Sequence, residues 1–372
     1  MSAPCVALPE RLRLEWFARV VAWQRGHGRR GLPWQGSRDP YRVWLSEVML
    51  QQTQVATVLR YYERFLQRFS DVYALAAASL DEVLALWGGL GYYSRARHLH
   101  ACAKAVVQHH GGVFPATADA LATLPGIGPS TAAAIAAFCW GERRSILDGN
   151  VRRVLARVWA DAGPDAAAHR WWWNTAQALV PADASADDMA AYTQGLMDLG
   201  ATVCTRTRPR CADCPVATLC AGHASGEPTR WPARTSRPAR RTETWWLPLY
   251  VRADGAWWLQ RRPARGIWAG LWSPPVLREE AGLRAWLASH PDVRAEWAPV
   301  IDHALTHRDL RLQPVCCRVP LADAAVAPNA PGVLPDQGAW WVPADAFALG
   351  LPAPVRAWLQ ALGAGERASS SR

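Results

Sequence analysis

The chain has 372 residues, and its 41 Lys and Arg against 31 Asp and Glu give a formal net charge of +10. That length is long for one hydrophobic core and favours two domains, while 50% hydrophobic and 19% charged residues exclude a chain that is disordered throughout. No apolar run approaches the about 20 residues that a membrane helix needs, and an N-terminus with Glu10 among its first residues lacks a signal-peptide layout. We therefore expect a soluble cytoplasmic protein without membrane contact.

Arginine supplies almost all of the positive charge, since Lys104 is the only lysine, and the chain has 22 tryptophans. Arginine and tryptophan together suit phosphate binding and base stacking. A GC-rich genome also replaces lysine by arginine in every protein, which is the simpler explanation of the bias. Composition alone therefore permits a nucleic-acid partner and does not establish one.

Residues from Leu12 to about Leu199 are predicted to form one helix after another. Apolar residues recur there at three- to four-residue spacing, as a helix with one buried face requires. The glycines of residues 88–93 interrupt this pattern and predict a loop. The recurring positions include Leu45, Val48, Val55, Leu59, Tyr62 and Leu66.

Glu47 is the first candidate for chemistry in this helical region. Burial of a carboxyl group disfavours its charged form, and a general acid that works near neutral pH requires this. An alternative, that Glu47 faces water, is weakened by its apolar surroundings. Its helical neighbours three and four positions away, none of them basic, are Val43, Trp44, Leu50 and Gln51.

A glycine-containing turn, Leu124–Pro129, lies between two of the predicted helices. Gly126 and Gly128 permit a turn whose N–H groups point outward at a helix N-terminus, where a phosphate can bind. Pro129 suits the first position of the second helix. Taken alone, a Gly-x-Gly segment is more often only a turn, so the pattern gains weight only from what surrounds it.

Asp148 follows Gly128 by twenty residues and precedes another amphipathic helix. On its own it is most simply the N-cap of that helix. Together with Glu47 it becomes a candidate second carboxylate.

Four of the nine cysteines fall in one short segment, Cys204-x6-Cys211-x2-Cys214-x5-Cys220. Four thiolates at such spacings can hold Zn²⁺ or an iron–sulfur cluster. Only the central pair has the short spacing typical of a zinc site, so the unequal spacings favour [4Fe–4S]. An odd cysteine total without a signal peptide argues against a disulfide framework. The arginines that such a centre would hold toward phosphate are Arg206, Arg208 and Arg210.

A stretch rich in Pro and Arg, residues 223–243, predicts a linker between a helical domain of residues 1–222 and a second domain of residues 244–362. Beyond it the period changes to that of strands. Asp254-Gly255 predicts the tight turn of a hairpin. Further strands are expected near residues 300–302, 310–319 and 340–342, with helices near 277–289 and 354–362. The second domain is therefore expected to be α+β, and residues 363–372 are expected to be disordered.

Taken in order, these residues resemble the helix-hairpin-helix DNA glycosylases with a [4Fe–4S] cluster, and among them the MutY-type adenine DNA glycosylases. The matching segments are residues 44–55, 89–95, 124–128 and 146–151 and the four cysteines, so that the resemblance covers nearly the whole chain. It implies an all-α helix-hairpin-helix domain with an iron–sulfur cluster loop, followed by a Nudix-like α+β domain. The implied protein is a monomer of base excision repair, associated with the nucleoid, that removes adenine mispaired with 8-oxoguanine or guanine in duplex DNA.

The resemblance also implies roles for single residues. In the family the catalytic acid, the aspartate and an asparagine match Glu47, Asp148 and Asn150, and the four cysteines match the cluster ligands. The family's lesion-sensing Phe-Ser-His appears here as Leu305-Thr306-His307, which loses an aromatic ring. Two alternatives stay open, because Asn150 also suits a turn and Gln194 also suits a helix surface. The implied DNA or base contacts are Gln52, Tyr92, Gly126, Gly128, Ser130, Gln194, Thr306 and His307.

Two other functions compete with this interpretation. Endonuclease III-like lyases share the turn, the aspartate and the cluster, but they carry a Schiff-base lysine where this chain has Ser130. Without that amine, water is the expected nucleophile and strand cleavage is not expected. A DNA-binding lesion sensor without catalysis would explain the charge and the cysteines. It would give no reason for an apolar helix to carry Glu47 in the same chain as Asp148.

Overall fold

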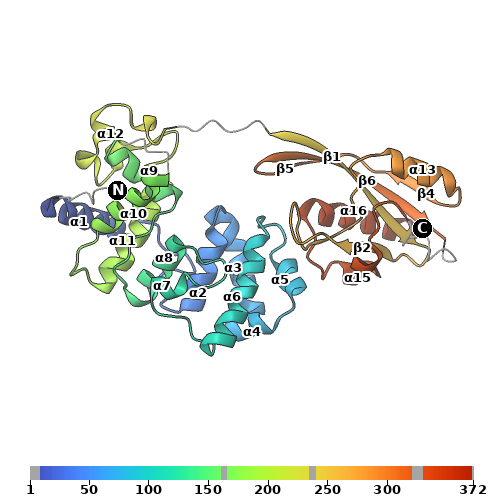
Figure 1. Cartoon of the computed structure of the whole chain (residues 1–372), viewed down its shortest axis with the longest axis horizontal. Helices are drawn as coiled ribbons and strands as arrows, with labels where there is room; N and C mark the ends of the chain where they lie inside the picture. The colour runs from blue at the N-terminus through green and yellow to red at the C-terminus, as the bar shows by residue number, and fades with distance from the viewer. Residues whose placement is uncertain (1–8, 161–165, 234–239, 321–329, 371–372) are drawn as a thin grey trace. The chain divides into compact units, whose positions relative to one another are not determined.

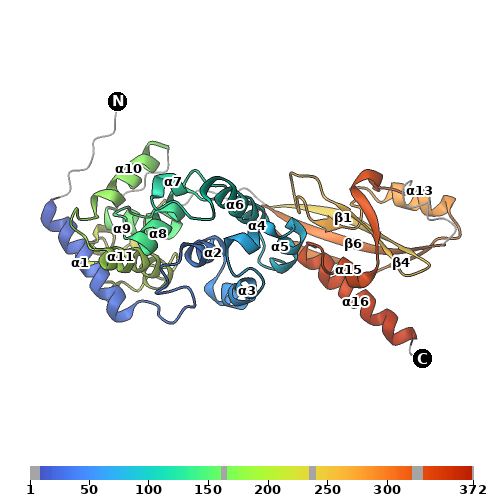
Figure 2. The same ribbon diagram turned by 90° about the horizontal axis from the view of Figure 1, so that it is seen from below.

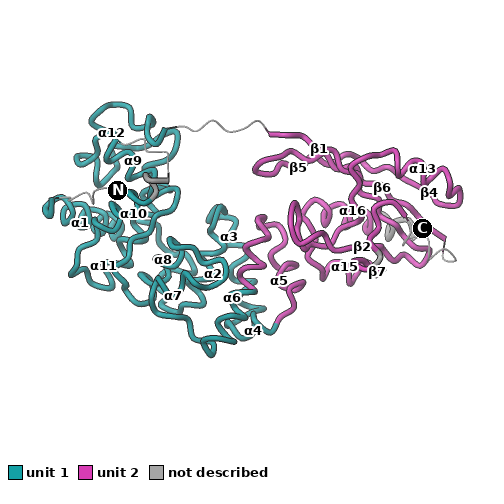
Figure 3. Tube along the Cα trace, in the orientation of Figure 1, with its two compact units in different colours: residues 1–77, 101–236 teal, residues 78–100, 237–372 magenta. Residues whose placement is uncertain are grey.

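A computed structural model describes residues 9–160, 166–233, 240–320 and 330–370 of the chain. Contacts between residues divide the chain into two compact units (Figure 3). Unit 1 consists of Met1–Ala77 and Ala101–Ser236. Unit 2 consists of Ala78–His100 and Arg237–Arg372. The second unit therefore includes a short helical segment that the sequence assigned to the helical region. Residues 234–239 of the expected linker lie outside the described residues.

Unit 1 is built from helices, as expected (Figure 1). One of them, α6, begins in the segment that belongs to unit 2 and continues into unit 1. The helices are α1 (Glu10–His27), α2 (Pro40–Leu50), α3 (Val55–Arg68), α4 (Val72–Ala77), α6 (Ser94–His110), α7 (Ala118–Leu121), α8 (Pro129–Trp140), α9 (Gly149–Val158), α10 (Ala166–Ala178), α11 (Ala186–Asp198) and α12 (Ala221–Ala224), with a π-helical turn at Leu199–Val203 and 3₁₀ turns at Cys211–Asp213, Ala217–Leu219 and Pro228–Arg230.

Local chemistry explains where the important helices begin. Asp39 caps α2, because its carboxylate accepts the N–H of Tyr41 at 2.9 Å, and Pro40 occupies the first turn. α8 begins at Pro129 directly behind Gly128, as the sequence predicted. These starts fix which side chains of α2 and α8 face the interior.

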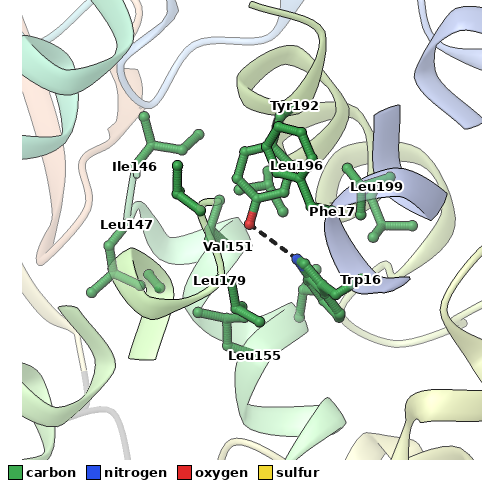
Figure 4. Packing of buried hydrophobic residues seen from close by; sticks show 14 of the residues in the cluster. Trp16, Phe17, Ile146, Leu147, Val151, Leu155, Leu179, Tyr192, Leu196 and Leu199 are labelled. Atoms are coloured by element: carbon green, nitrogen blue, oxygen red, sulfur yellow. Dashed lines mark hydrogen bonds between the residues drawn. The ribbon is translucent and has the colours of Figure 1, made fainter. Parts of the chain in front are cut away.

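The core of unit 1 joins α1, α9 and α11 (Figure 4). Trp16 is 1% exposed and donates its indole N–H to the hydroxyl of Tyr192 at 3.0 Å, so that a buried polar pair is satisfied within the apolar cluster. Leu155 and Leu196 pack in the same cluster, and each such buried side chain stabilises the fold by about 1.5–3 kcal/mol. This core holds the helices that carry Asn150 and Gln194.

Unit 2 is a mixed sheet with helices. Its strands follow the order β3-β2-β1-β6-β4, with β5 also paired to β6 and β7 to β2. β1 and β6 are parallel, and the other pairs are antiparallel. Its elements are α5 (Leu80–Leu86), β1 (Arg241–Arg252), β2 (Trp257–Arg261), β3 (Trp272–Ser273), α13 (Ala281–Ser289), β4 (Arg294–Trp297), β5 (Ile301–Ala304), β6 (Arg308–Val319), a 3₁₀ turn (Pro335–Gln337), β7 (Gly338–Trp341), α15 (Pro343–Ala346) and α16 (Ala353–Ser370).

Helices cover both faces of this sheet. Trp257 and Trp258 are neighbours on β2 and therefore point to opposite faces. Trp258 belongs to the apolar cluster that includes Trp286 of α13, whereas the ring of Trp257 meets Phe347, just after α15, at 5.8 Å. In Figure 2, α13 and α16 lie on opposite sides of the sheet. The expected α+β class is confirmed.

Three expectations about element bounds were wrong. The helix expected from residue 277 begins at Ala281. Residues 363–372 were expected to be disordered, but α16 continues to Ser370, since no proline interrupts it and Ala, Glu and Arg favour helix. Residues 371–372 lie outside the described residues. The expected linker also begins too early, because residues 221–224 form α12 and the carbonyl of Trp231 accepts a hydrogen bond from Arg157 at 3.1 Å.

Within the described residues, none of the helices has the length and apolar character needed to span a membrane.

Candidate active site

Glu47 lies on α2 and lines a cavity of about 610 Å³ inside unit 1. Burial and, to a smaller extent, the negative charge of Asp148 together raise the pKa of its carboxyl group to about 8. Glu47 therefore keeps its proton at neutral pH. Other residues that line the cavity are Arg25, Arg29, Arg30, Trp34, Gln35 and Gln194.

Asp148 has the opposite environment, because it is exposed at the N-terminus of α9. Its Oδ1 accepts the backbone N–H groups of Asn150 and Val151 at 2.9 and 2.8 Å, and its Oδ2 accepts the amide of Asn150 at 3.3 Å. Asp148 is thus an N-cap, and a helix N-terminus stabilises a negative charge. One buried carboxyl group that keeps its proton and one exposed carboxyl group at a helix N-terminus therefore occur in the same unit.

Gln194 lines the same cavity as Glu47, so the structure does not place it on an open helix surface. Its amide nitrogen donates to Oδ1 of Asp198 at 2.8 Å. Asp198 is 0% exposed and pairs with Arg29 at 2.6 Å. The sequence did not predict this ion pair. The one feature in the sequence that could have indicated it is an aspartate in an apolar part of a predicted core helix.

Asn150 connects Asp148 to the chain segment ahead of the cysteines. Its Oδ1 accepts from Arg153 at 2.9 Å, and Arg153 also donates to the carbonyls of Gly200 and Cys204 at 2.6 and 2.9 Å. Asn150 is therefore held on both sides by hydrogen bonds. Sequence reasoning missed Arg153, because an arginine on an amphipathic helix carries no distinguishing signal.

The turn at residues 122–128 between α7 and α8 has the expected backbone. Gly126 has a φ of 76°, which favours glycine. Gly128 is extended and caps α8, leaving the first N–H groups of that helix without helical partners. Ser130 accepts the N–H of Leu147 at 3.1 Å and so ties α8 to the residue before Asp148.

Gln52 follows α2 with a φ of 56°, a left-handed conformation that is strained for a residue with a side chain. It is exposed. Gln51 donates to the hydroxyl of Thr131 at 3.2 Å and anchors this end of α2 to α8. Strain of this kind clusters at binding and catalytic sites.

The four cysteines Cys204, Cys211, Cys214 and Cys220 line one small cavity of unit 1 and form no disulfides. In the part of the chain that the structure describes, no three His, Cys, Asp or Glu side chains are grouped closely enough to hold one metal ion. The thiolate ligands of a single Zn²⁺ all lie about 2.3 Å from the ion. Thiols that are spread around a cavity therefore suit a multinuclear metal cluster better than a single Zn²⁺.

Arg157 supports this cysteine segment from α9. It is 2% exposed, and it donates to Sγ of Cys204 at 3.2 Å and to the carbonyl of Thr205 at 2.7 Å. The N–H of His223 points at Sγ of Cys220 at 3.4 Å. Donors aimed at sulfur suit thiolate ligands, so these residues fit an iron–sulfur cluster.

Unit 2 has a cavity of its own, of about 540 Å³. Tyr92 from the loop before α6 and Thr306 from the turn between β5 and β6 both line it, and their hydroxyl groups lie 3.0 Å apart within hydrogen-bonding distance. His307 and Trp268 line it as well. The structure thus brings Tyr92, Thr306 and His307 to one cavity, although the first is far from the others in the sequence.

Comparisons with known proteins agree with this arrangement. A model for the HhH-GPD superfamily of base excision DNA repair proteins matches residues 45–172, and a NUDIX domain model matches residues 247–361. The adenine DNA glycosylase of Buchnera aphidicola subsp. Baizongia pistaciae (strain Bp) is 32% identical over 307 residues, covering 81% of this chain and 86% of that protein. That of Mus musculus is 35% identical, covering 89% and 74%. The structure of a thermostable thymine-DNA glycosylase matches with a TM-score of 0.52 and 26% identity, covering 58% of this chain and 98% of that one.

Proposed function

The chain belongs to the adenine DNA glycosylases of base excision repair, and from this premise we propose that it removes adenine mispaired with 8-oxoguanine or guanine. It would act on duplex DNA as a monomer at the nucleoid. The observation that carries the mechanism is the contrast between two carboxyl groups: Glu47 protonated in a cavity and Asp148 exposed at a helix N-terminus. Glycosidic bonds are commonly hydrolysed by such a pair.

The adenine has to leave the base stack before it can reach Glu47. Extrusion costs roughly a few kcal/mol and less for a mispair. We assign Gln52 and Tyr92 to the duplex, where they would fill the space that the adenine vacates. Gln194 would hydrogen-bond the edge of the extruded base in the cavity that it shares with Glu47.

Bond cleavage then starts with a proton. Glu47 donates its proton to N7 of adenine, the bond between C1′ and N9 breaks, and adenine leaves as a neutral base. The positive charge that develops on the sugar is stabilised by the carboxylate of Asp148. Water adds to C1′ and gives its proton to Glu47, which restores the starting state. Asn150, held by Asp148 and Arg153, would orient the carboxylate or the water.

The reaction should stop at base removal. The position at which a lyase needs an amine is Ser130, whose hydroxyl oxygen already accepts the N–H of Leu147. Borohydride should therefore trap no major covalent complex between the protein and DNA. Efficient trapping would overturn the assignment to hydrolysis alone.

Two parts of unit 1 are assigned to the DNA backbone and its support. Gly126 and Gly128 would let the N–H groups at the start of α8 bind a phosphate. Cys204, Cys211, Cys214 and Cys220 would hold a [4Fe–4S] cluster, whose contribution is to fix the loop that carries the arginines at residues 206–210. The cluster has no part in the chemical step.

Recognition of the opposite base is assigned to residues 244–362. 8-Oxoguanine differs from guanine in carrying a C8 carbonyl and a donor at N7. The hydroxyl of Thr306 can both donate and accept, and the imidazole of His307 offers one donor and one acceptor. Both groups line the cavity of unit 2, as a lesion-reading site requires.

The test is single-turnover excision from three duplexes that carry adenine opposite 8-oxoguanine, guanine or thymine. The expected order is fastest opposite 8-oxoguanine, slower opposite guanine and negligible opposite thymine. Equal rates on all three would refute the proposed specificity. Tight binding to the 8-oxoguanine duplex without any excision would instead favour a sensor without catalysis.

A further inference from the structure

Arg95 is a buried arginine that the mechanism above does not use. It lies in the first turn of α6 and is 7% exposed. Its Nη2 donates to the carbonyls of Leu90 and Gly91, both at 3.3 Å. Its backbone N–H donates to the carbonyl of Tyr92 at 2.9 Å. Side chain and backbone of one residue thus hold three successive carbonyls of the loop before α6.

The same guanidinium group also touches two aromatic rings. Its central carbon lies 5.2 Å from the centre of the Trp87 ring and 5.6 Å from that of Tyr92. Trp87 completes the arrangement by donating its indole N–H to the carbonyl of Gly91 at 3.1 Å. A cation at such distances is attracted to the ring faces. Arg95 therefore contacts Tyr92 itself as well as the backbone that carries it.

The loop that these contacts hold is strained. Gly89 and Gly91 have φ values of 101° and 72°, and Tyr92 follows with a φ of 46°. Glycine adopts such angles freely, whereas tyrosine does so only at a cost in free energy. Strained residues persist where the surrounding structure over-determines them. The contacts of Arg95 help to hold Tyr92 in this strained conformation.

Burial of Arg95 has its own cost. Removal of the guanidinium group from water lowers its pKa to about 10. Two carbonyl oxygens and two ring faces that lie against this charge belong to residues 87–92. A buried cation that contacts the loop of residues 87–92 in this way indicates that the protein maintains one conformation of the loop.

The ring of Tyr92 is nevertheless accessible. The residue is 43% exposed, and its hydroxyl lies 3.0 Å from that of Thr306. Tyr92 is thus fixed at its backbone by Arg95 and contacted at its tip by Thr306. An aromatic residue held in this way can enter a base stack without first ordering its own loop, which lowers the entropic cost of insertion.

We propose that Arg95 is a positioning residue that holds Tyr92 ready to enter the duplex as the adenine leaves. This inference rests on the proposed function, since Tyr92 has to be the residue that fills the duplex. Lysine would not replace Arg95 fully, because it lacks the planar fork that reaches two carbonyls while lying on a ring. Arg95 itself does not touch the reacting atoms.

A double-mutant cycle tests the inference in the full chain. Single-turnover excision opposite 8-oxoguanine is measured for the wild type, Arg95→Met, Tyr92→Ala and the combination. Arg95→Met should slow excision on the order of tenfold to a hundredfold. In the Tyr92→Ala background the same change should alter the rate by no more than about twofold, because Arg95 then has nothing to position. Equal losses in both backgrounds, or no loss in the wild type, would overturn the inference.

A second readout follows extrusion of the base without the chemical step. 2-Aminopurine in place of the adenine fluoresces when it leaves the stack, and Arg95→Met should slow that signal by the same factor as excision. Slow excision with normal extrusion would contradict a role through Tyr92. If Arg95→Met does not fold, the cycle is run with Arg95→Lys and judged by the same criterion.

The matched control is Arg64→Met, since Arg64 is an exposed arginine whose guanidinium carbon lies 5.7 Å from the ring centre of Tyr61. It should leave both readouts unchanged, and a loss equal to that of Arg95→Met would overturn the inference. Failure of the proposed function can be distinguished from failure of the inference about Arg95. A wild type without preference among opposite bases would refute the specificity, while the cycle and the fluorescence signal would still report on Arg95.

Discussion

The two cavities differ in what lines them. The cavity of unit 1 is surrounded by arginines and contains the carboxyl group of Glu47, whose pKa burial raises to about 8. The cavity of unit 2 also has two arginines, Arg97 and Arg308, and is lined by Trp268, Thr306 and His307, but no carboxylate is among the described residues that line it. A proton donor that works near neutral pH needs a carboxyl group with a raised pKa, whereas a site that reads a base needs donors, acceptors and a flat surface. Under the proposed function, chemistry is assigned to unit 1 and lesion recognition to unit 2.

Glu47→Gln should have the largest effect on excision. The amide has nearly the same shape but no proton to give, so excision should fall on the order of 10⁴-fold. Binding to the mispaired duplex should persist. Single-turnover kinetics with a parallel binding titration would check this, and normal excision would show that Glu47 is not the acid.

Asp148→Asn should have the next largest effect. Loss of the negative charge near the sugar should slow excision on the order of 10²- to 10³-fold, while stability should change little, because Asn caps helices as well as Asp does. Asp39→Asn is the matched control, since Asp39 caps α2 in the same manner. If both variants lost activity equally, the charge of Asp148 would have no special role.

The pH dependence of excision should reflect Glu47 alone in the region of its pKa. Its carboxyl group is protonated below about 8 and ionised above, so the rate should fall about tenfold per pH unit beyond pH 8. A rate that stays constant up to pH 10 would contradict the assignment.

Stability should also report on Glu47. Its folded pKa of about 8 lies above the ordinary 4.5, so the folded state binds more protons between these pH values. The free energy of unfolding contributed by Glu47 should therefore decrease as the pH rises from about 4.5 to 8. Glu47→Gln should remove this dependence in denaturant titrations at pH 5 and pH 8. An identical pH dependence in wild type and variant would argue that Glu47 is not buried.

Changes in unit 2 should be smaller and of another kind. Thr306→Ala should lower the preference for 8-oxoguanine over guanine by about tenfold, the value of one good hydrogen bond to a base. The rate opposite guanine should stay within about twofold of the wild type. Competition between the two duplexes in one reaction would measure this, and an unchanged preference would remove Thr306 from the recognition site.

The sequence predicted what depends on local chemistry. Pro129 behind Gly128 and Asp148 ahead of an apolar period determine where α8 and α9 begin, and both starts appear in the structure. The apolar neighbours of Glu47 likewise predicted a disfavoured charge, and its raised pKa agrees with that. Such features need only residues a few positions apart.

Contacts between distant residues were not predictable in this way. The pairing of Asp198 with Arg29 and the approach of Tyr92 to Thr306 join positions far apart in the chain. A single sequence has no local pattern that marks such partners. Arg95 was not predicted for another reason. The chain is rich in arginine, so an arginine beside the loop glycines carries no signal in the sequence, and only its burial in the structure distinguishes it.

The most direct test of the division between the units is a ratio of two rates. Single-turnover excision of adenine opposite 8-oxoguanine and opposite guanine is measured for the full chain and for the double variant Thr306→Ala and His307→Ala. If unit 2 reads the lesion, the ratio should fall toward one while the rate opposite guanine stays within about twofold of the wild type. A parallel fall of both rates with an unchanged ratio would contradict it, because unit 2 would then support the chemistry of unit 1 without reading the lesion.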